Sequence, residues 1–183
     1  QRHEDLFWAL RGAGAQGLGV VTRLTLRTLP EPAATSFHLK WPYERASALI
    51  AAWQEWSPTG PDELAASLLV TVGGEAGADP VVHLFGSMIG SETETAALLD
   101  EFVSVAGADA ASSERAHMRY GSLKNYLAER GPGDQEDEHG RPYMKSEFFR
   151  EPLPAGAVDA LVDLIVRGRR PGEARKLDFM PWG

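Results

Sequence analysis

Residues 64–89 read LAASLLVTV GGEAGADP VVHLFGSMI, and this stretch decides the fold class. Leu64–Val72 and Val81–Ile89 are apolar and of strand length, which predicts two β-strands. Gly73–Pro80 carries the glycines and the proline of a loop. The sequence therefore predicts a β-hairpin at this point.

Outward from the hairpin, strand and helix patterns are interspersed. Period-two alternation predicts three more strands, at Thr35–Trp41, Tyr143–Phe149 and Arg175–Pro181. Apolar residues at helical spacing predict helices at Tyr43–Trp56, from Ser91 to about Val105, at Tyr120–Ala128 and at Pro154–Val166. About five strands with four helices indicate an α+β domain, an antiparallel sheet with helices packed on one face.

Local signals support this assignment. Ser91-Glu92-Thr93-Glu94 fits a capping box, in which Ser91 and Glu94 satisfy free amides at a helix start. The polar, acidic run Gly131–Arg141 predicts a loop. It lacks the oxygen-bearing ligand residues at alternate positions that a calcium-binding loop has.

The N-terminal part has a different pattern of apolar, polar and glycine residues. His3–Leu10 predicts a short helix, Gly12–Gly19 a turn, and the alternation of Leu18–Leu29 a strand. Pro30-Glu31-Pro32 ends that strand. We expect two regions, residues 1–32 and residues 33–183, with the sheet in the second.

The turn contains Gly12-Ala13-Gly14-Ala15-Gln16-Gly17, which matches the spacing G-x-G-x-x-G. A Rossmann dinucleotide site needs a strand before the glycines and a helix after them. Here the order is reversed, and the first aspartate after the turn is Asp62. The glycines then either permit a tight crossover with positive φ or let the backbone touch a ligand.

Composition excludes several classes of function. The 183 residues carry a net charge of −8, which argues against nucleic-acid binding, and no apolar run is long enough to span a membrane. No cysteine is present, and the five histidines lack metal-ligand spacing, so we expect no metal site. The absence of cysteine is compatible with any compartment; we favour the cytoplasm. The chain starts at Gln1 without Met and stops at Gly183, and we expect an internal segment of a longer protein.

The residues around the turn carry a family resemblance. Asp5–Gly14, followed by Gly19-Val20-Val21-Thr22, resembles the closing motif of the flavin-binding domain in berberine bridge enzyme-like, FAD-linked oxidases. Gln16, Gly17 and Leu18 depart from the family's usual residues, which puts a side-chain contact at Gly17 in doubt. The resemblance implies that the backbone of this turn approaches FAD, with these candidate contacts: Gly14, Gly17, Leu18, Gly19, Val20 and Val21.

The resemblance continues, more weakly, along the chain. Segments similar to the family's substrate domain follow in order: Tyr43–Trp56, Pro61–Leu64, Phe85–Ser91, Lys145–Phe149 and Leu177–Gly183. It implies that residues 1–32 end an FAD-binding domain of the PCMH type and that residues 33–183 form most of a substrate-binding domain. The pyrophosphate loop, any covalent tether of FAD and the catalytic base would lie outside this chain.

The resemblance also implies a role for the sheet, as a roof over the flavin ring and the substrate. Polar or aromatic strand residues are then the pocket candidates: Tyr143, Lys145, Ser146, Phe148, Asp178 and Met180. On the last strand Leu177 and Phe179 are expected to face the core, so that Asp178 and Met180 face the pocket. For Tyr143–Phe149 the pattern leaves both faces open, and an ordinary solvent-facing role remains an alternative for Lys145 and Asp178.

The sequence thus predicts part of an FAD-dependent oxidoreductase that transfers a hydride from an alcohol, a sugar or a secondary metabolite to flavin, with O₂ as acceptor. Its partners are a small-molecule substrate and the remaining FAD-binding domain of the same polypeptide. The segment alone is expected to be inactive. The alternative is a stand-alone, non-catalytic α+β ligand-binding module.

Overall fold

The computed structural model describes residues 3–12, 17, 19–75, 77–130 and 143–181, and these form two compact units, Gln1–Pro30 and Glu31–Gly183. The loop expected at 131–141 lies outside the described residues, as do Gly14 and Leu18 of the glycine turn. No helix among the described residues is long and apolar enough to cross a membrane.

In the first unit the predicted helix forms, and the predicted strand does not. Helix α1 (Glu4–Leu10) carries Glu4 and Asp5 in its first turn, where negative charge suits the helix dipole. Within the described part of 18–29, the chain forms no strand, and Val20 is 90% exposed. The prediction at 18–29 is wrong for this chain because alternation makes a strand only where a second strand supplies hydrogen bonds.

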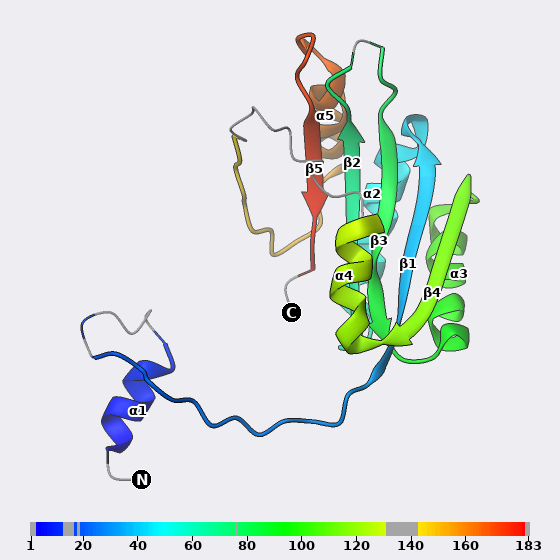
Figure 1. The fold of residues 1–183 in the computed structure, drawn as a ribbon. Helices are drawn as coiled ribbons and strands as arrows, with labels where there is room; N and C mark the ends of the chain where they lie inside the picture. Colours follow the sequence, from blue (N-terminus) through cyan, green and yellow to red (C-terminus); the bar gives the residue numbers. More distant parts are fainter. Residues whose placement is uncertain (1–2, 13–16, 18, 76, 131–142, 182–183) are drawn as a thin grey trace. The chain divides into compact units, whose positions relative to one another are not determined.

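The second unit is built on one antiparallel sheet, which confirms the predicted α+β fold. Its strands are arranged in the order β4-β1-β3-β2-β5 (Figure 1). Their bounds are β1 Ala33–Pro42, β2 Leu64–Val72, β3 Val81–Ile89, β4 Ser112–Arg119 and β5 Arg175–Phe179.

The hairpin β2–β3 has the predicted limits and lies between β1 and β5. Leu68 pairs with Leu84 and Val70 with Val82, and all four side chains are buried. At Gly86, which pairs with Ala66, an added Cβ would meet the Ala65 carbonyl oxygen and the Phe37 ring. A glycine therefore allows β2 and β3 to pack closely there.

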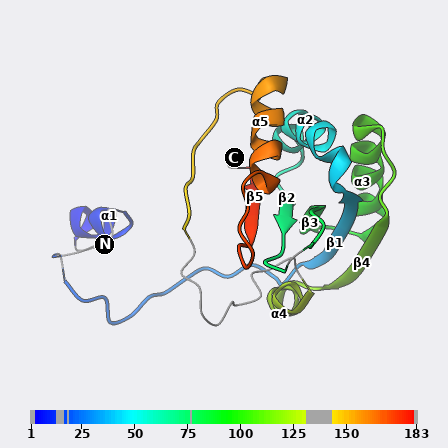
Figure 2. The ribbon, with the colours of Figure 1, turned by 90° about the horizontal axis from the view of Figure 1, so that it is seen from above.

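Three helices cover one face of the sheet, and a fourth lies on the other side (Figure 2). The covering helices are α2 (Ala46–Trp56), α3 (Glu92–Ala106) and α5 (Ala155–Val166), with 3₁₀ turns η2 (Tyr43–Arg45) and η3 (Ser57–Thr59) on either side of α2. Helix α4 (Tyr120–Arg130) is the one on the opposite face. Helix α3 starts with the predicted capping box.

The core lies between the sheet and helices α2, α3 and α5. It contains these fully buried large side chains: Trp41, Phe37, Phe102, Leu49, Ile50, Leu68, Leu84 and Leu99. Burying each contributes roughly 2–3 kcal/mol. Two indole N–H groups within the core donate to backbone carbonyls, Trp41 to Ala108 and Trp53 to Ala66, so that their polar atoms are satisfied.

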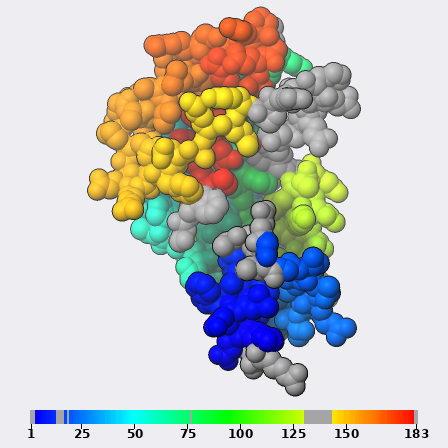
Figure 3. Space-filling view, turned by 90° about the vertical axis from the view of Figure 1, so that its left-hand side faces the viewer, coloured from blue at the N-terminus to red at the C-terminus, as the bar shows by residue number. Residues whose placement is uncertain are grey.

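Two of the expectations for the sheet need correction. The strand predicted at Tyr143–Phe149 is absent: this stretch is an extended, exposed chain without a ladder, visible as yellow atoms at the surface (Figure 3). The fifth strand is instead β4, which the sequence did not indicate. Its residues, SSERAHMR, are polar because it is an edge strand with largely exposed side chains, and pairing with β1 stabilises it.

Candidate functional site

The strand register divides the sheet into an apolar face and a polar face. Leu39, Leu84 and Leu68 follow one another across β1, β3 and β2 on the face that α2, α3 and α5 cover. The neighbouring residues point the other way. On that other face, here called the open face, His38 lies beside Phe85, and Lys40 beside His83.

A chain of hydrogen bonds runs across the open face over three strands. The Nε2 atom of His38 on β1 is 2.9 Å from Nδ1 of His83 on β3. The Nε2 atom of His83 is in turn 2.9 Å from Oγ1 of Thr71 on β2. Each imidazole nitrogen donates or accepts according to its tautomer, so the three side chains form one connected hydrogen-bond network.

Both imidazoles are held in the neutral form. Burial, followed by the neighbouring His38 and Lys40, lowers the pKa of His83 from 6.5 to about 4. Burial and Lys40 also lower the pKa of His38, and the carboxylate of Glu114 on β4 opposes that shift. At neutral pH both rings are therefore proton acceptors as well as donors.

His38 is the accessible end of this chain. His83 is only 9% exposed, whereas His38 is half-buried and lines a small hollow. Residues of β1, β3, β4 and α4 surround that hollow: Ser36, Phe37, His38, Phe85, Glu114 and Tyr126. The Phe85 ring meets the His38 ring edge to face at 5.6 Å between centroids. The hollow thus combines an aromatic wall with an imidazole and a carboxylate.

Strand β5 completes the open face at its other edge. Leu177 and Phe179 pack against the core, as predicted, so Asp178 and Lys176 lie on the open face. Their side chains approach to 3.9 Å. Met180, which follows the strand, is half-exposed. Asp178 pairs with Leu69, and Leu69 pairs with His83, so two strand spacings separate Asp178 from His83.

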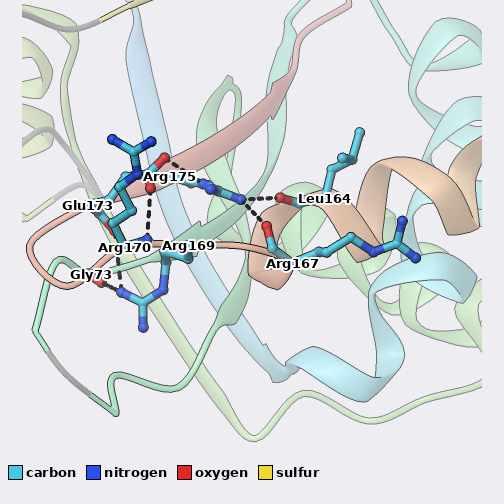
Figure 4. Close-up of polar contacts among 7 residues, drawn as sticks. All are labelled: Gly73, Leu164, Arg167, Arg169, Arg170, Glu173 and Arg175. Carbon is cyan, nitrogen blue, oxygen red and sulfur yellow. Dashed lines mark hydrogen bonds and ion pairs between the residues drawn. The ribbon is translucent and has the colours of Figure 1, made fainter.

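Arginines fix β5 in this place (Figure 4). Arg175, its first residue, donates from Nη1 to the carbonyls of Leu164 and Arg167 at the end of α5, and from Nε to Glu173. Arg169 donates to the Gly73 carbonyl in the β2–β3 loop. The two bonds from Nη1 of Arg175 satisfy carbonyls at the C-terminal end of α5, where the helix itself supplies no donor. They join β5, α5 and the hairpin loop.

The other pocket candidates lie away from the sheet. Tyr143, Lys145, Ser146 and Phe148 belong to the exposed stretch and share no strand with Asp178. The Lys145 ammonium is 6.0 Å from the centre of the Tyr143 ring, the outer limit of a cation–π contact. Their proposed position on a strand is therefore wrong, because no strand in the described part of the chain pairs with residues 143–149.

The described part of the glycine turn suits backbone contact with a flat ligand. Gly17 and Gly19 have φ of +81° and +144°, and the space that a Cβ would fill is open at both. Val20 is exposed and Val21 half-exposed. A ligand could approach these two glycines without meeting a side chain of their own. Gly17 and Gly19 therefore offer only backbone atoms to a ligand.

Sequence reasoning missed His38, His83 and Thr71. The two histidines alternate with core residues in their strands, so the pattern places them on the open face, opposite the core. Only the register brings their rings together, across 45 residues of sequence. Within the described ranges, no three His, Asp or Glu side chains gather closely enough to bind a metal.

No protein-family model matches the chain. In sequence it is 34% identical over 98 residues to an uncharacterised FAD-linked oxidoreductase (YvdP) of Bacillus subtilis, which covers 53% of this chain and 21% of the relative. It is 38% identical over 66 residues to the xylooligosaccharide oxidase of Thermothelomyces thermophilus, a match that covers 33% of this chain and 13% of the relative. The chain thus spans about a fifth or less of the curated relatives it matches.

Solved structures share the fold over more of the chain. Phl p 4, a grass pollen allergen with glucose dehydrogenase activity, superposes with a TM-score of 0.68 at 19% identity, over 98% of this chain and 36% of that one. The xylooligosaccharide oxidase of Myceliophthora thermophila, in complex with xylobiose, superposes with a TM-score of 0.59 at 24% identity. The match covers 90% of this chain and 35% of that one. The relatives are FAD-linked oxidoreductases, and the resemblance inferred from the sequence is confirmed over part of their length.

Proposed function

We propose that this chain is a segment of an FAD-dependent oxidoreductase of the berberine bridge enzyme-like type, and that the whole protein oxidises a small organic substrate. The observation that carries the proposal is the agreement of two comparisons: the sequence relatives are FAD-linked oxidoreductases, and a related fold covers 98% of the chain. Fold alone would not establish function.

The chain's first unit would contribute to cofactor binding. Gly17 and Gly19 offer open backbone next to exposed Val20 and Val21, which supports a contact with FAD through the main chain. The remaining FAD-binding domain of the same polypeptide would supply the other contacts and any covalent tether. When bound, FAD supplies the hydride acceptor, and O₂ is the proposed final acceptor.

The open face of the sheet would contribute to the substrate pocket. Its polar and aromatic side chains support this role, since α2, α3 and α5 bury the opposite face in the core. An alcohol, a sugar or a hydroxylated secondary metabolite is the proposed substrate class. One structural neighbour binds xylobiose and another binds (S)-reticuline, both small molecules.

The test is the spectrum and the redox behaviour of the purified full-length protein. We expect a yellow protein with the absorbance bands of flavin, whose colour bleaches without oxygen when glucose, xylobiose or benzyl alcohol is added and returns on admission of air. Colour that stays with the acid-precipitated protein would indicate a covalent tether.

A colourless full-length protein that takes up no added FAD would contradict the proposal and favour a non-catalytic binding module. If air does not restore the colour, only the proposal that O₂ is the acceptor is contradicted. The 183-residue chain by itself is expected to bind FAD more weakly than about 1 μM, because it contains only the backbone donors of the turn.

A further inference from the structure

The chain contains four methionines and no cysteine, so all of its sulfur atoms are thioethers. Their exposure to solvent differs widely. Met88, on β3, is 8% exposed, and Met118, on the edge strand β4, is partly buried. Met180 is 51% exposed and Met144 is 82% exposed. Of the four thioethers, these two are therefore the most open to a dissolved reagent.

The two exposed methionines lie in different surroundings. Met144 belongs to the extended, exposed stretch that has no strand beside it in the described part of the chain. Met180 directly follows β5. The ring of Phe179, the last residue of that strand, packs on the core side beside Trp53, with centroids 6.0 Å apart. Successive residues of an extended chain point to opposite sides, so Met180 lies on the side of Asp178, at the open face.

The proposed reaction generates an oxidant for these sulfur atoms. When O₂ reoxidises the flavin, it takes up two electrons and two protons and leaves as hydrogen peroxide. Hydrogen peroxide converts a thioether to a sulfoxide: an S–O bond forms, the O–O bond breaks, and water is released. The sulfur is oxidised by two electrons and the peroxide is reduced by two. A flexible, apolar side chain thereby becomes a polar one.

We propose that Met180 is a site of reversible oxidation, and that its sulfoxide weakens the binding of substrate. The inference rests on the proposed function, because it needs a flavin that O₂ reoxidises and a substrate pocket on the open face. Peroxide that collects in solution during turnover reaches Met144 as well. Only at Met180 does the added oxygen lie on the face of the sheet that contributes to the pocket. The product of the reaction thus lowers the activity of the enzyme.

The first experiment treats resting full-length FAD protein with hydrogen peroxide, so that no turnover is needed. Catalase then removes the peroxide, and peptide mass spectrometry reports the sulfoxide at each methionine. We expect oxidation of Met144 and Met180, the former faster because its side chain is more exposed, and none of buried Met88. A Met180 that stays reduced while Met144 is oxidised overturns the inference.

The second experiment measures flavin reduction without oxygen, before and after the same treatment. Glucose, xylobiose and benzyl alcohol are tried in turn, and the compound that reduces the wild-type flavin fastest is used. After oxidation we expect the substrate concentration at half-maximal rate to rise at least about threefold, comparable to losing the burial of one methylene group. The maximal rate should change less, because the sulfur takes no part in hydride transfer. Methionine sulfoxide reductases should reverse the effect.

Two leucine variants separate the exposed sulfur atoms. Leucine is similar to methionine in volume and offers no sulfur to peroxide. In Met180→Leu, peroxide treatment should leave the half-maximal concentration unchanged from the value of the untreated variant. Met144→Leu is the matched control, and its response to peroxide should equal that of the wild type. Flavin content and circular dichroism of each variant show whether it has folded.

The outcomes separate this inference from the proposed function. A full-length protein without FAD overturns both. A flavin that air does not reoxidise overturns the inference together with O₂ as the acceptor. If O₂ reoxidises the flavin, the inference alone is overturned by a flavin that none of the three compounds reduces, by unchanged substrate dependence after oxidation of Met180, or by an equal peroxide effect in Met180→Leu. Weaker substrate dependence that Met180→Leu abolishes and Met144→Leu retains would support it.

Discussion

Nε2 of His38 and Nδ1 of His83 lie 2.9 Å apart, although 45 residues separate them in the sequence. The antiparallel pairing of β1 and β3 places them on the same face in neighbouring rows: His38 is opposite Phe85, and His83 is opposite Lys40. Their rings therefore meet diagonally across the strand pair, with centroids 5.1 Å apart.

This pair makes stability depend on pH. The pKa of His83 is lowered from 6.5 to about 4, with burial as the main cause and His38 and Lys40 adding to it. Between these values the unfolded chain binds a proton that the folded protein does not, so the free energy of unfolding falls as pH decreases from 6.5 to 4. We expect the free energy of unfolding to fall by about 2 kcal/mol over this pH range. This is less than the value that the full pKa shift would give, because the pair is partly hydrated.

Urea unfolding at several pH values measures this effect. His83→Gln should remove most of the slope between pH 6.5 and 4, since glutamine does not titrate. A slope that persists unchanged in that variant would show that another group causes it.

Trp53 should matter to stability far more than Trp8. Trp53 is 6% exposed and donates from its indole nitrogen to the Ala66 carbonyl. Trp53→Phe leaves a cavity and an unpaired carbonyl, so we expect a loss of about 2–3 kcal/mol in chemical unfolding. Trp8, which is 74% exposed in the first unit, gives the control: Trp8→Phe should change stability by less than about 0.5 kcal/mol. Equal effects would contradict the described core.

Gly86→Ala should disrupt the hairpin. Its Cβ would collide with the Ala65 carbonyl of β2, a backbone atom that cannot move without separating the strands. We expect the free energy of unfolding to fall by more than about 3 kcal/mol, or the variant not to fold at all. Gly156→Ala in α5 meets nothing within 4 Å and should stabilise by about 0.5–1 kcal/mol. Thermal unfolding of the two variants compares them, and a folded Gly86→Ala protein of normal stability would refute the packing.

Arg175→Ala should loosen β5 and the end of α5. The variant loses the donors to the Leu164 and Arg167 carbonyls, so amide hydrogen exchange should accelerate in both elements. Arg167→Ala is the matched control, because within the described residues that side chain forms only an exposed pair with Asp163. Equal exchange in the two variants would show that Arg175 does not hold β5.

Local signals in the sequence were sufficient for much of the fold. The capping box at Ser91 and Glu94 and the limits of β2 and β3 agree with the prediction, because each depends on residues close in sequence. The stretches 18–29 and 143–149 show the limit of such signals. Their alternation suits a strand, yet the described residues there have no strand beside them. Conversely, β4 is polar and was missed, because its pairing with β1 rather than its composition makes it a strand.

The sequence by itself determined the α+β class, the hairpin, the helix starts and the kinship with FAD-linked oxidoreductases, since these depend on local periodicity and short motifs. Only the tertiary structure decided which residues of different strands lie next to one another on the open face. Strand order and register are set by packing between distant segments, and a shift of one residue would turn every side chain to the other face. That register brings His38, His83 and Thr71 within hydrogen-bond distance, which no local pattern in the chain indicates.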